Sequence, residues 1–282
     1  MEYRELKSLL DRNLHRIKTI GMHHEKITEL RRLLNGGSGE SGTDLAVEGM
    51  WALQKLLTAG LRIKAFIICP ECIYSIEGIQ LAEKMIVSAE EIYTVSKKVM
   101  EKLSGRDKPD GFITIAELQE YGERGLILPD RALVMVLDGL ESPGNIGTIL
   151  RSCDGAGVDA VLLCNMNVRM THPKLIKASM GAVFRVPVVY FAEAEHCVKW
   201  LTSRDYQIYL ADSAAVDGYT SISYENNTAL VVGNERYGLS DIWYDPGPRL
   251  VSIPMHGLCD SLNVGVAASI LAYTVIQQRQ QG

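Results

Sequence analysis

The stretch 133–151, LVMVLDGLESPGNIGTILR, joins an apolar run to a helical pattern through a short turn that contains glycine and proline. Its first five residues are apolar throughout, which is typical of a strand buried on both faces. A helix that begins after such a turn points free backbone N–H groups at an anion. We expect Asn145 near the start of this helix and Arg151 about one and a half turns further on. A capping asparagine and a surface arginine would explain the same residues, so this loop needs support from others.

Five more runs rich in apolar residues follow towards the C-terminus, with helical patterns between them. They are residues 158–163, 186–191, 207–211, 229–232 and 250–253. Apolar strands that alternate with helices indicate an α/β fold, with a parallel sheet covered by helices. Ligands bind such sheets at the carboxyl ends of the strands. The loops that follow the strands are therefore where we expect a site.

The loop after the run 229–232 reads GNERYGLS, residues 233–240. It begins with Gly233, which lets the backbone approach a ligand closely because glycine has no side chain. Glu235 lies at the end of a strand, where packing does not require a carboxylate. An ion pair with Arg236 on the surface would also account for it.

The loop after the run 250–253 ends in Ser261-Leu262-Asn263, at the start of an alanine-rich helical pattern. Either polar residue can cap a helix, because its side-chain oxygen accepts a hydrogen bond from a free N–H of the first turn. Capping explains one of the two residues easily, and both together less well. The pair is therefore a second indication of a site.

The N-terminal part has a different pattern, in which short helices and strands alternate. We expect strands over 63–69, 92–95 and 112–115, and helices over 48–58, 79–85 and 96–103. Helical spacing over 3–20 and 27–34 comes before them and ends in a glycine-rich loop. The sequence thus predicts a basic helical extension with this loop over 1–43, a small α/β domain over 44–116, a linker over 117–130 and the main domain over 131–282.

The composition is that of a soluble globular protein, with 47% hydrophobic and 22% charged residues in a chain of 282. No apolar run is long enough to span a bilayer, and the charged N-terminus does not resemble a secretory signal. We therefore expect a cytoplasmic protein without membrane association. Cys69 and Cys72 form a single CxxC pair with no second pair of ligands, so we expect reduced structural cysteines and no metal site.

Taken together, the three loops resemble, in order and spacing, the three motifs of the SpoU (TrmH-like) branch of the SPOUT RNA methyltransferases. Residues 173–174 and 178–187 are similar to the connecting segment of that family, so the resemblance runs from residue 133 to the C-terminus. Residues 44–115, with Val47-Glu48-Gly49 near their start, resemble the L30e-like substrate-binding domain of the ribosomal RNA members. Three ordered motifs are strong evidence, where a single motif would be weak.

The resemblance implies an enzyme that uses S-adenosyl-L-methionine to methylate a ribose 2′-hydroxyl in RNA. It also implies a sheet whose last segments form a trefoil knot, and a homodimer whose pocket is completed across the interface. The family's catalytic positions correspond here to Arg151, Asn145, Glu235, Ser261 and Asn263. Its cofactor-binding positions correspond to Gly233, Asn234, Glu235, Ile253, Met255, Ser261, Leu262 and Asn263.

Two residues depart from the family pattern. Ser142 stands where Asp or Asn usually precedes the proline, and Gly265 stands where a small hydroxyl residue is common. The family assigns removal of the hydroxyl proton to the arginine that matches Arg151. Arginine is a poor base, because its pKa lies above about 12. A bidentate clamp on a phosphate is the role we prefer for it, and the sequence leaves both roles open.

The L30e-like unit favours ribosomal RNA over transfer RNA as the partner. A formal net charge of −5 is unfavourable for contacts with phosphates, although segment 1–35 is locally basic. A transfer RNA ribose methyltransferase and a non-catalytic RNA-binding or ribosome-assembly module stay open as alternatives. A dinucleotide-dependent oxidoreductase is disfavoured, because no G-x-G-x-x-G follows a strand. Base methylation is disfavoured by the pairing of Asn145 with Arg151.

Overall fold

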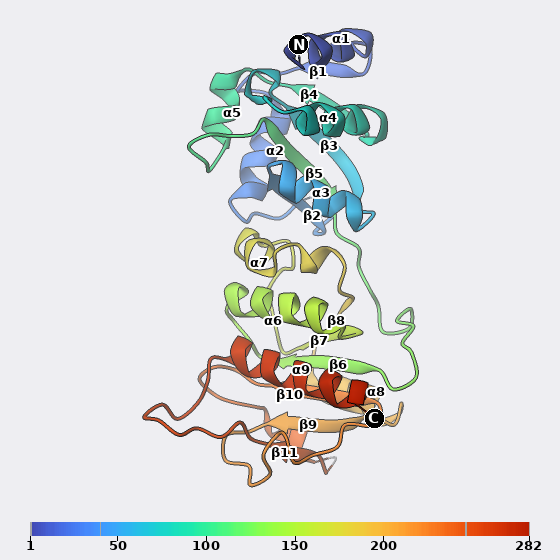
Figure 1. The fold of residues 1–282 in the computed structure, drawn as a ribbon, viewed down its shortest axis with the longest axis vertical. Coiled ribbons are helices and arrows are strands. Elements are labelled where there is room, and N and C mark those ends of the chain that lie inside the picture. Colours follow the sequence, from blue (N-terminus) through green and yellow to red (C-terminus); the bar gives the residue numbers. More distant parts are fainter. Residues whose placement is uncertain (1, 40, 246, 282) are drawn as a thin grey trace. The chain divides into compact units, whose positions relative to one another are not determined.

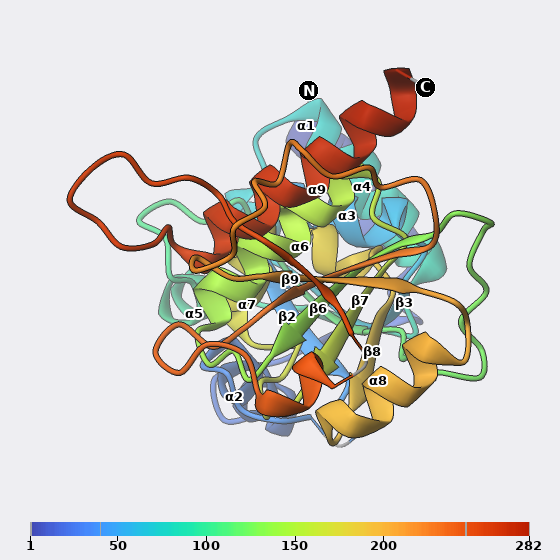
Figure 2. The same ribbon diagram turned by 90° about the horizontal axis from the view of Figure 1, so that it is seen from below.

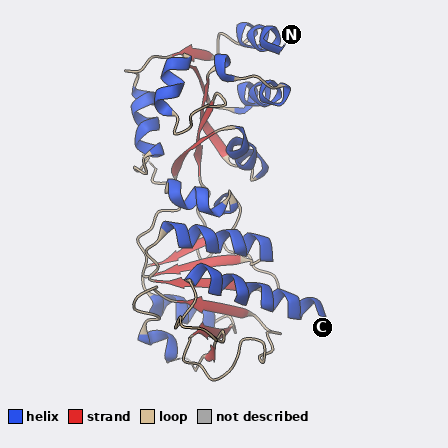
Figure 3. Cartoon of the chain, turned by 60° about the vertical axis from the view of Figure 1, so that its left-hand side comes forward, coloured by secondary structure: helices blue, strands red, loops and turns tan. Residues whose placement is uncertain are grey.

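The computed structural model describes residues 2–39, 41–245 and 247–281. The chain divides into two compact units, which are treated separately below (Figures 1 and 3). The first comprises Met1–Gln119 with Thr171–Pro173, and the second comprises Glu120–Met170 with Lys174–Gly282. Within the described residues, no helix has the length and apolar character needed to cross a membrane.

The first unit is a mixed sheet flanked by helices. Its strands are β1 (Ile17–Thr19), β2 (Asp44–Glu48), β3 (Arg62–Ile68), β4 (Glu91–Thr94) and β5 (Phe112–Glu117). Its helices are α1 (Glu2–Arg12), α2 (Glu25–Leu34), α3 (Met50–Thr58), α4 (Ile76–Ser88) and α5 (Lys97–Leu103), with a 3-10 turn η1 (Pro70–Cys72). The strand order is β1-β4-β3-β5-β2. β4 pairs in parallel with β1 and β3, whereas β5 is antiparallel to β2 and β3.

The predicted strands and helices between residues 48 and 115 are all present, and β2 is a further strand that the sequence did not indicate. The helical prediction over 3–20 was wrong at its C-terminal end, because α1 stops at Arg12 and Ile17–Thr19 forms β1. The reason is a distant contact: the Arg16 guanidinium donates to the carbonyl of Val87 in the last turn of α4 and to that of Ala89 directly after it, at 3.2 and 3.0 Å. This contact draws the segment into line with β4.

Residues 1–43 are not a separate extension, because β1 and α2 belong to the first unit's sheet and core. Ile27, Leu30 and Leu33 lie one helical turn apart on α2 and are buried. They share a core cluster with Ala65 and Ile67 of β3. The predicted boundary at residue 43 is thus a loop inside a compact unit.

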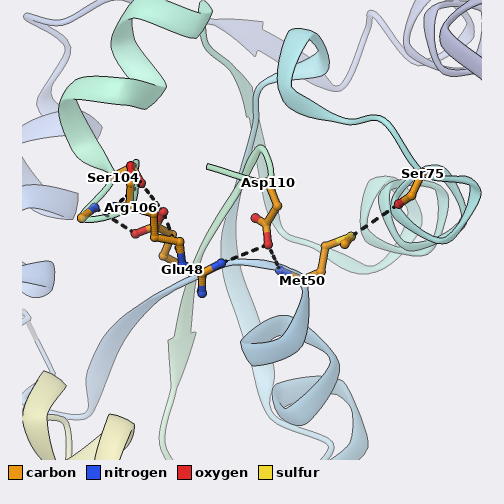
Figure 4. A network of polar contacts seen from close by, with 7 residues as sticks. Glu48, Met50, Ser75, Ser104, Arg106 and Asp110 are labelled. Atoms are coloured by element: carbon orange, nitrogen blue, oxygen red, sulfur yellow. Dashed lines mark hydrogen bonds and ion pairs between the residues drawn. The ribbon is translucent and has the colours of Figure 1, made fainter. Parts of the chain in front are cut away.

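Gly49 makes the turn from β2 to α3, and its backbone φ of +96° is a conformation that favours glycine. The Arg106 side chain lies beside Glu48 (Figure 4). Its guanidinium also lies against Gly49, so that a β-carbon there would be 2.6 Å from Nη1. Arg106 Nη1 donates to Asp110 Oδ2 at 3.2 Å, and the same oxygen accepts the Met50 N–H at 2.9 Å. Asp110 therefore caps α3 from a distant segment, which gives Glu48-Gly49 a structural role.

Cys69 and Cys72 are buried in the first unit, with their sulfurs 3.4 Å apart. Burial raises the pKa of the Cys69 thiol to about 12, so the thiol stays protonated near neutral pH. Among the residues described, no three His, Cys, Asp or Glu side chains are grouped to hold a metal ion.

The second unit is a wholly parallel sheet of six strands. They are β6 (Leu133–Asp138), β7 (Ala160–Cys164), β8 (Val188–Phe191), β9 (Gln207–Ala211), β10 (Thr228–Val232) and β11 (Arg249–Val251). The helices are α6 (Pro143–Ala156), α7 (Pro173–Ser179), α8 (Ala194–Thr202) and α9 (Val264–Gln281), with 3-10 turns η2 (Ala182–Phe184) and η3 (Asp241–Tyr244). The strand order is β11-β9-β10-β6-β7-β8. All six apolar runs of the sequence are strands, so the predicted α/β class is confirmed.

Helices cover both faces of this sheet (Figure 2). Val134 and Val136 of β6 point to the face on which α8 packs, in one cluster with Leu201. The alternate residues Leu133 and Met135 point to the opposite face and are equally buried. Helices α6 and α9 pack on each other, and α9 also packs on β10. Burial on both faces explains why the strands are apolar throughout.

The segment between β5 and β6 contains no helix or strand, although the predicted linker over 117–130 takes in Glu117, the last residue of β5. Part of it is nevertheless packed, because Tyr121, Leu126 and Leu128 lie against the core of the second unit. The division between the two units accordingly falls at residues 119 and 120.

Candidate active site

The site is built at the carboxyl ends of the strands of the second unit. β6 and β10 are neighbours at the centre of the sheet, with Leu137 paired to Val232 at their ends. The loops after these two strands therefore start side by side, although 95 residues separate the paired positions (232 − 137). The third loop follows β11 and leads into α9.

Three side chains, one from each loop, form a chain of hydrogen bonds. Asn145 Nδ2 donates to Glu235 Oε1 at 2.7 Å. Asn263 Nδ2 donates to Asn145 Oδ1 at 3.2 Å, and Asn263 Oδ1 accepts the Gly265 N–H at 2.9 Å. Each asparagine uses its oxygen as an acceptor and its nitrogen as a donor, so the contacts fix the orientation of both amides. The result is a polar cluster that three separate surface caps would not produce.

The first loop is held by an ordinary helix cap. Ser142 is the N-cap of α6, its hydroxyl accepts the Asn145 N–H at 3.4 Å, and Pro143 is the first helical residue. Asp, Asn and Ser all cap well, which explains why Ser142 can replace the residue usual in the family. The cap leaves the side chain of Asn145 free to reach Glu235.

The second loop forms a closed hairpin. Asn234 and Gly238 exchange two backbone hydrogen bonds of 2.9 Å each. Asn234 Oδ1 accepts the N–H groups of Arg236 and Tyr237 at 2.8 and 3.1 Å, while its Nδ2 donates to the carbonyl of Gly139 at 2.7 Å. Asn234 thus fixes the hairpin to the first loop.

Glycine is required just before this hairpin. A β-carbon on Gly233 would lie 2.4 Å from the backbone carbon and oxygen of Gly238. Ordinary contact begins at 3.4 Å, so any larger residue would push the hairpin open.

Asp138 connects the loop after β7 to the end of the second loop. It is the last residue of β6 and only 3% exposed. Its Oδ1 accepts from Asn165 Nδ2 at 2.7 Å, and its Oδ2 accepts the Ser240 N–H at 2.9 Å as well as the Ser240 hydroxyl. Asp138 therefore anchors the second loop at its far end, a role that the sequence did not reveal.

A cavity of about 580 Å³ opens beside the polar cluster. Eight of the predicted residues line it: Gly233, Asn234, Glu235, Ile253, Met255, Ser261, Leu262 and Asn263. Its volume is in the range of sites for small molecules and cofactors, which is about 300–1,000 Å³. Apolar walls from Val232 and Leu262, beside the Glu235 carboxylate, suit a nucleoside with a polar tail.

The cavity also contains residues that the sequence analysis missed. Asp212 follows β9 directly, and its Oδ2 accepts from the Tyr244 hydroxyl at 3.2 Å. Burial, followed by the charge of Asp212, raises the pKa of Tyr244, so this tyrosine remains a hydrogen-bond donor. Ser213 lies beside them in the cavity wall. The rule that ligands bind after strand ends would have found Asp212, since residues 207–211 were predicted as a strand.

Arg151 has a different position from the other predicted residues. It is exposed on α6, and it is not among the residues that line the cavity. Within the described residues it makes no hydrogen bond or ion pair. Its guanidinium is therefore available for a ligand rather than committed to the fold.

Two family models match the chain. The model of the SpoU rRNA Methylase family matches residues 132–273, and that of the MRM3-like substrate binding domain matches residues 24–114. The second match begins at residue 24, directly before α2, which agrees with the inclusion of α2 in the first unit.

Two relatives and two solved structures illustrate the similarity. A putative TrmH family tRNA/rRNA methyltransferase from Staphylococcus haemolyticus is 28% identical over 84% of this chain and 97% of that protein. The 23S rRNA (guanosine-2′-O-)-methyltransferase RlmB of Xanthomonas axonopodis is 37% identical, over 53% of this chain and 60% of that protein. A crystal structure of an RNA 2′-O ribose methyltransferase is 31% identical over 94% of this chain and 99% of that one, with a TM-score of 0.73. An AdoMet-bound rRNA methyltransferase from Sinorhizobium meliloti shares the fold, with a TM-score of 0.80 at 24% identity over 93% and 98% of the two chains.

The fold of the second unit is that of a SPOUT methyltransferase domain. The chain belongs to the SpoU rRNA methylase family and carries an MRM3-like substrate-binding domain. The predicted class of enzyme, an RNA ribose 2′-O-methyltransferase that uses S-adenosylmethionine, is confirmed.

Proposed function

We propose that the protein methylates a ribose 2′-hydroxyl in ribosomal RNA. S-adenosylmethionine supplies the methyl group when it is bound. The observation that carries the proposal is the chain of hydrogen bonds from Asn263 through Asn145 to Glu235, two members of which line the cavity. A binding module would have no need for three loops to meet in this way.

The cofactor is assigned to the cavity. Gly233, Ile253 and Leu262 frame the adenosine there, mainly through backbone groups and apolar contact, while Asn234 and Met255 complete the wall. Ser261 and Glu235 hold the polar end of the cofactor. The close contact of Gly233 with the hairpin supports this assignment, because it leaves the cavity wall free of side chains at that point.

Arg151 is assigned to the RNA. A guanidinium is a poor base but a good partner for a phosphate, to which it can donate two parallel hydrogen bonds. Arg151 clamps a phosphate beside the target and stabilises negative charge that develops on the ribose oxygen. The hydroxyl proton leaves through a phosphate oxygen or water. Asn145, Glu235, Ser261 and Asn263 keep the ribose and the cofactor in register, which is the main requirement of an in-line transfer.

Ribosomal RNA is preferred over transfer RNA as the substrate. The support is the first unit, which matches a substrate-binding domain over residues 24–114. Residues 1–116 serve together as this domain, since β1 and α2 are part of its core. A transfer RNA substrate is the alternative, and the relatives' names include both kinds of RNA.

Three further properties belong to this proposal. We assign the family's trefoil knot to the last segments. The position of β11 beyond β9 and the packing of α9 on α6 support this assignment. The enzyme is a homodimer, supported by Val266 and Tyr273, which are 45% and 51% exposed on α9. It acts in the cytoplasm. Sedimentation equilibrium with and without a Tyr273→Glu substitution tests the dimer.

The proposed reaction is tested by incubating the protein with methyl-labelled S-adenosylmethionine and unmodified ribosomal or transfer RNA. The RNA is then hydrolysed in alkali, because a 2′-O-methyl group blocks cleavage at its own linkage. We expect label in an alkali-resistant dinucleotide from ribosomal RNA. Arg151→Ala removes this label, whereas Arg124→Ala, at another exposed arginine of the second unit, retains it.

The other outcomes point to the alternatives. Label in transfer RNA alone would make the protein a transfer RNA methyltransferase. Label released as mononucleotides would mean base methylation. Absence of label, with no heat of cofactor binding in calorimetry, would support the non-catalytic RNA-binding module.

A further inference from the structure

Tyr237 is the most exposed tyrosine, tryptophan or phenylalanine among the described residues, with 81% of the residue's surface accessible. Water surrounds most of the ring, and no aromatic or cation–π contact stabilises it within the described residues. Tyr190 and Tyr244 in the same unit are 49% and 43% exposed, and each donates its hydroxyl to a protein acceptor. The fold therefore has no use for the Tyr237 ring.

The backbone beneath this ring is held firmly in place. Tyr237 lies at the tip of the hairpin that Asn234 and Gly238 close, and its own N–H donates to Asn234 Oδ1 at 3.1 Å. Two residues earlier, Glu235 is bound to Asn145 at 2.7 Å. The backbone that carries the ring is thus fixed beside the polar cluster, and Tyr237 is one of the residues that line the cavity.

RNA is the ligand whose chemistry suits such a ring. Proteins read single-stranded RNA by stacking unpaired bases on aromatic side chains. The neighbouring Arg236 is exposed, and only its backbone N–H is used within the described structure, so its guanidinium can reach a phosphate. The cofactor does not need this ring, because Ile253 and Leu262 already supply apolar walls to the cavity. A ring that served the cofactor would also be less exposed than Tyr237 is.

We infer that Tyr237 is a specificity-determining residue, whose ring stacks on the base of the nucleotide that is methylated, while Arg236 contacts the adjoining phosphate. The inference rests on the proposed function. Stacking on Tyr237 fixes the base, and thereby turns the attached ribose towards Asn145 and Glu235. Stacking of this kind requires a target nucleotide that is unpaired or flipped out of a helix.

The test compares Tyr237→Ala with Tyr237→Phe and Tyr237→Leu in steady-state methylation of the RNA substrate. Loss of one base–aromatic stack raises KM for RNA about 5- to 150-fold. We expect this increase for the Ala and Leu variants and not for Phe, which retains the ring. The Kd for S-adenosylmethionine, measured by calorimetry, stays at the wild-type value in all three variants.

A second substrate identifies the base. With RNA that is abasic at the methylated nucleotide, the wild type should lose activity to the level of Tyr237→Ala, and the two proteins should then have equal KM values. An increase in cofactor Kd with unchanged KM for RNA would place the ring on the cofactor and overturn the inference. An equal effect of Tyr237→Ala on intact and abasic RNA would also overturn it. If the wild type methylates no RNA, the proposed function itself fails, and the inference falls with it.

Discussion

Gly233→Ala is the substitution whose effect follows most directly from the structure. The added β-carbon would lie 2.4 Å from the backbone carbon and oxygen of Gly238, and 2.6 Å from the nitrogen of Leu239. The shortfall from ordinary contact is 1.0 Å (3.4 − 2.4). All three atoms belong to the backbone, so no side chain can rotate away. The hairpin must open, and its two hydrogen bonds between Asn234 and Gly238 must break.

The cost can be worked from those bonds. Each contributes about 0.5–1.5 kcal/mol, so the second unit loses about 1–3 kcal/mol of unfolding free energy. For a unit of this size, that lowers Tm by about 2–12 °C. The larger effect is on the cofactor, since Gly233, Asn234 and Glu235 all shift. We expect the Kd for S-adenosylmethionine to rise at least about tenfold, which is 1.4 kcal/mol of binding free energy.

The assays are titration calorimetry for the cofactor and scanning calorimetry for Tm. Gly218→Ala is the matched control, because a β-carbon there meets nothing within 4 Å. Its Tm and Kd should equal those of the wild type. If Gly233→Ala binds the cofactor as tightly as Gly218→Ala, the closed hairpin does not shape the cavity and the reasoning is refuted.

Three further predictions concern other contacts. Asn145→Asp replaces the amide that donates to Glu235 Oε1 at 2.7 Å with a second carboxylate, so kcat should fall about 100-fold, and further than for Asn145→Ala, which removes the donor without adding a like charge. Burial alone would raise the pKa of Asp44, but the hydrogen bond and charge of Lys64 outweigh burial and hold this pKa below its ordinary value. The stability that Asp44 contributes is therefore fully present at pH values above the ordinary pKa of an aspartate, and it is lost as the pH falls through the lowered pKa. Lys64→Met should lower the unfolding free energy of the first unit by about 1–3 kcal/mol at pH 7, measured by urea unfolding. Asp138→Asn turns an amide group towards a donor at Asn165 or Ser240, and should lower the stability of the second unit by about 2–4 kcal/mol; an unchanged Tm would contradict the anchoring role of Asp138.

The sequence predicted the second unit well because its strands are buried on both faces. Residues 207–211, for example, read as an apolar run and form β9 over the same five positions. In the first unit the short strand β1 could not be predicted, since the Arg16 contacts that align it are made with residues more than 70 positions away. Local spacing carries no information about such contacts.

In the candidate site, too, local motifs could be predicted and distant contacts could not. Motif order indicated Asn145, Glu235 and Asn263, each from its own loop. Their mutual hydrogen bonds join residues 90 and 118 positions apart, and only the strand order brings them together. Asp138 was missed because a buried aspartate has no signature in a single sequence, whereas Asp212 directly follows a predicted strand and its position could have indicated it.

The strand order also has a consequence for biosynthesis. β6 is made early, but its partner β10 lies 95 residues later. At a translation rate of about 5–20 residues per second, roughly 5–20 s pass before the edge of β6 that pairs with β10 can find its partner. An apolar strand with an open edge is a binding site for chaperones and for other nascent chains. The yield of active protein should therefore depend on the speed of translation between residues 139 and 227, and synonymous codon changes there would alter it without changing a single amino acid.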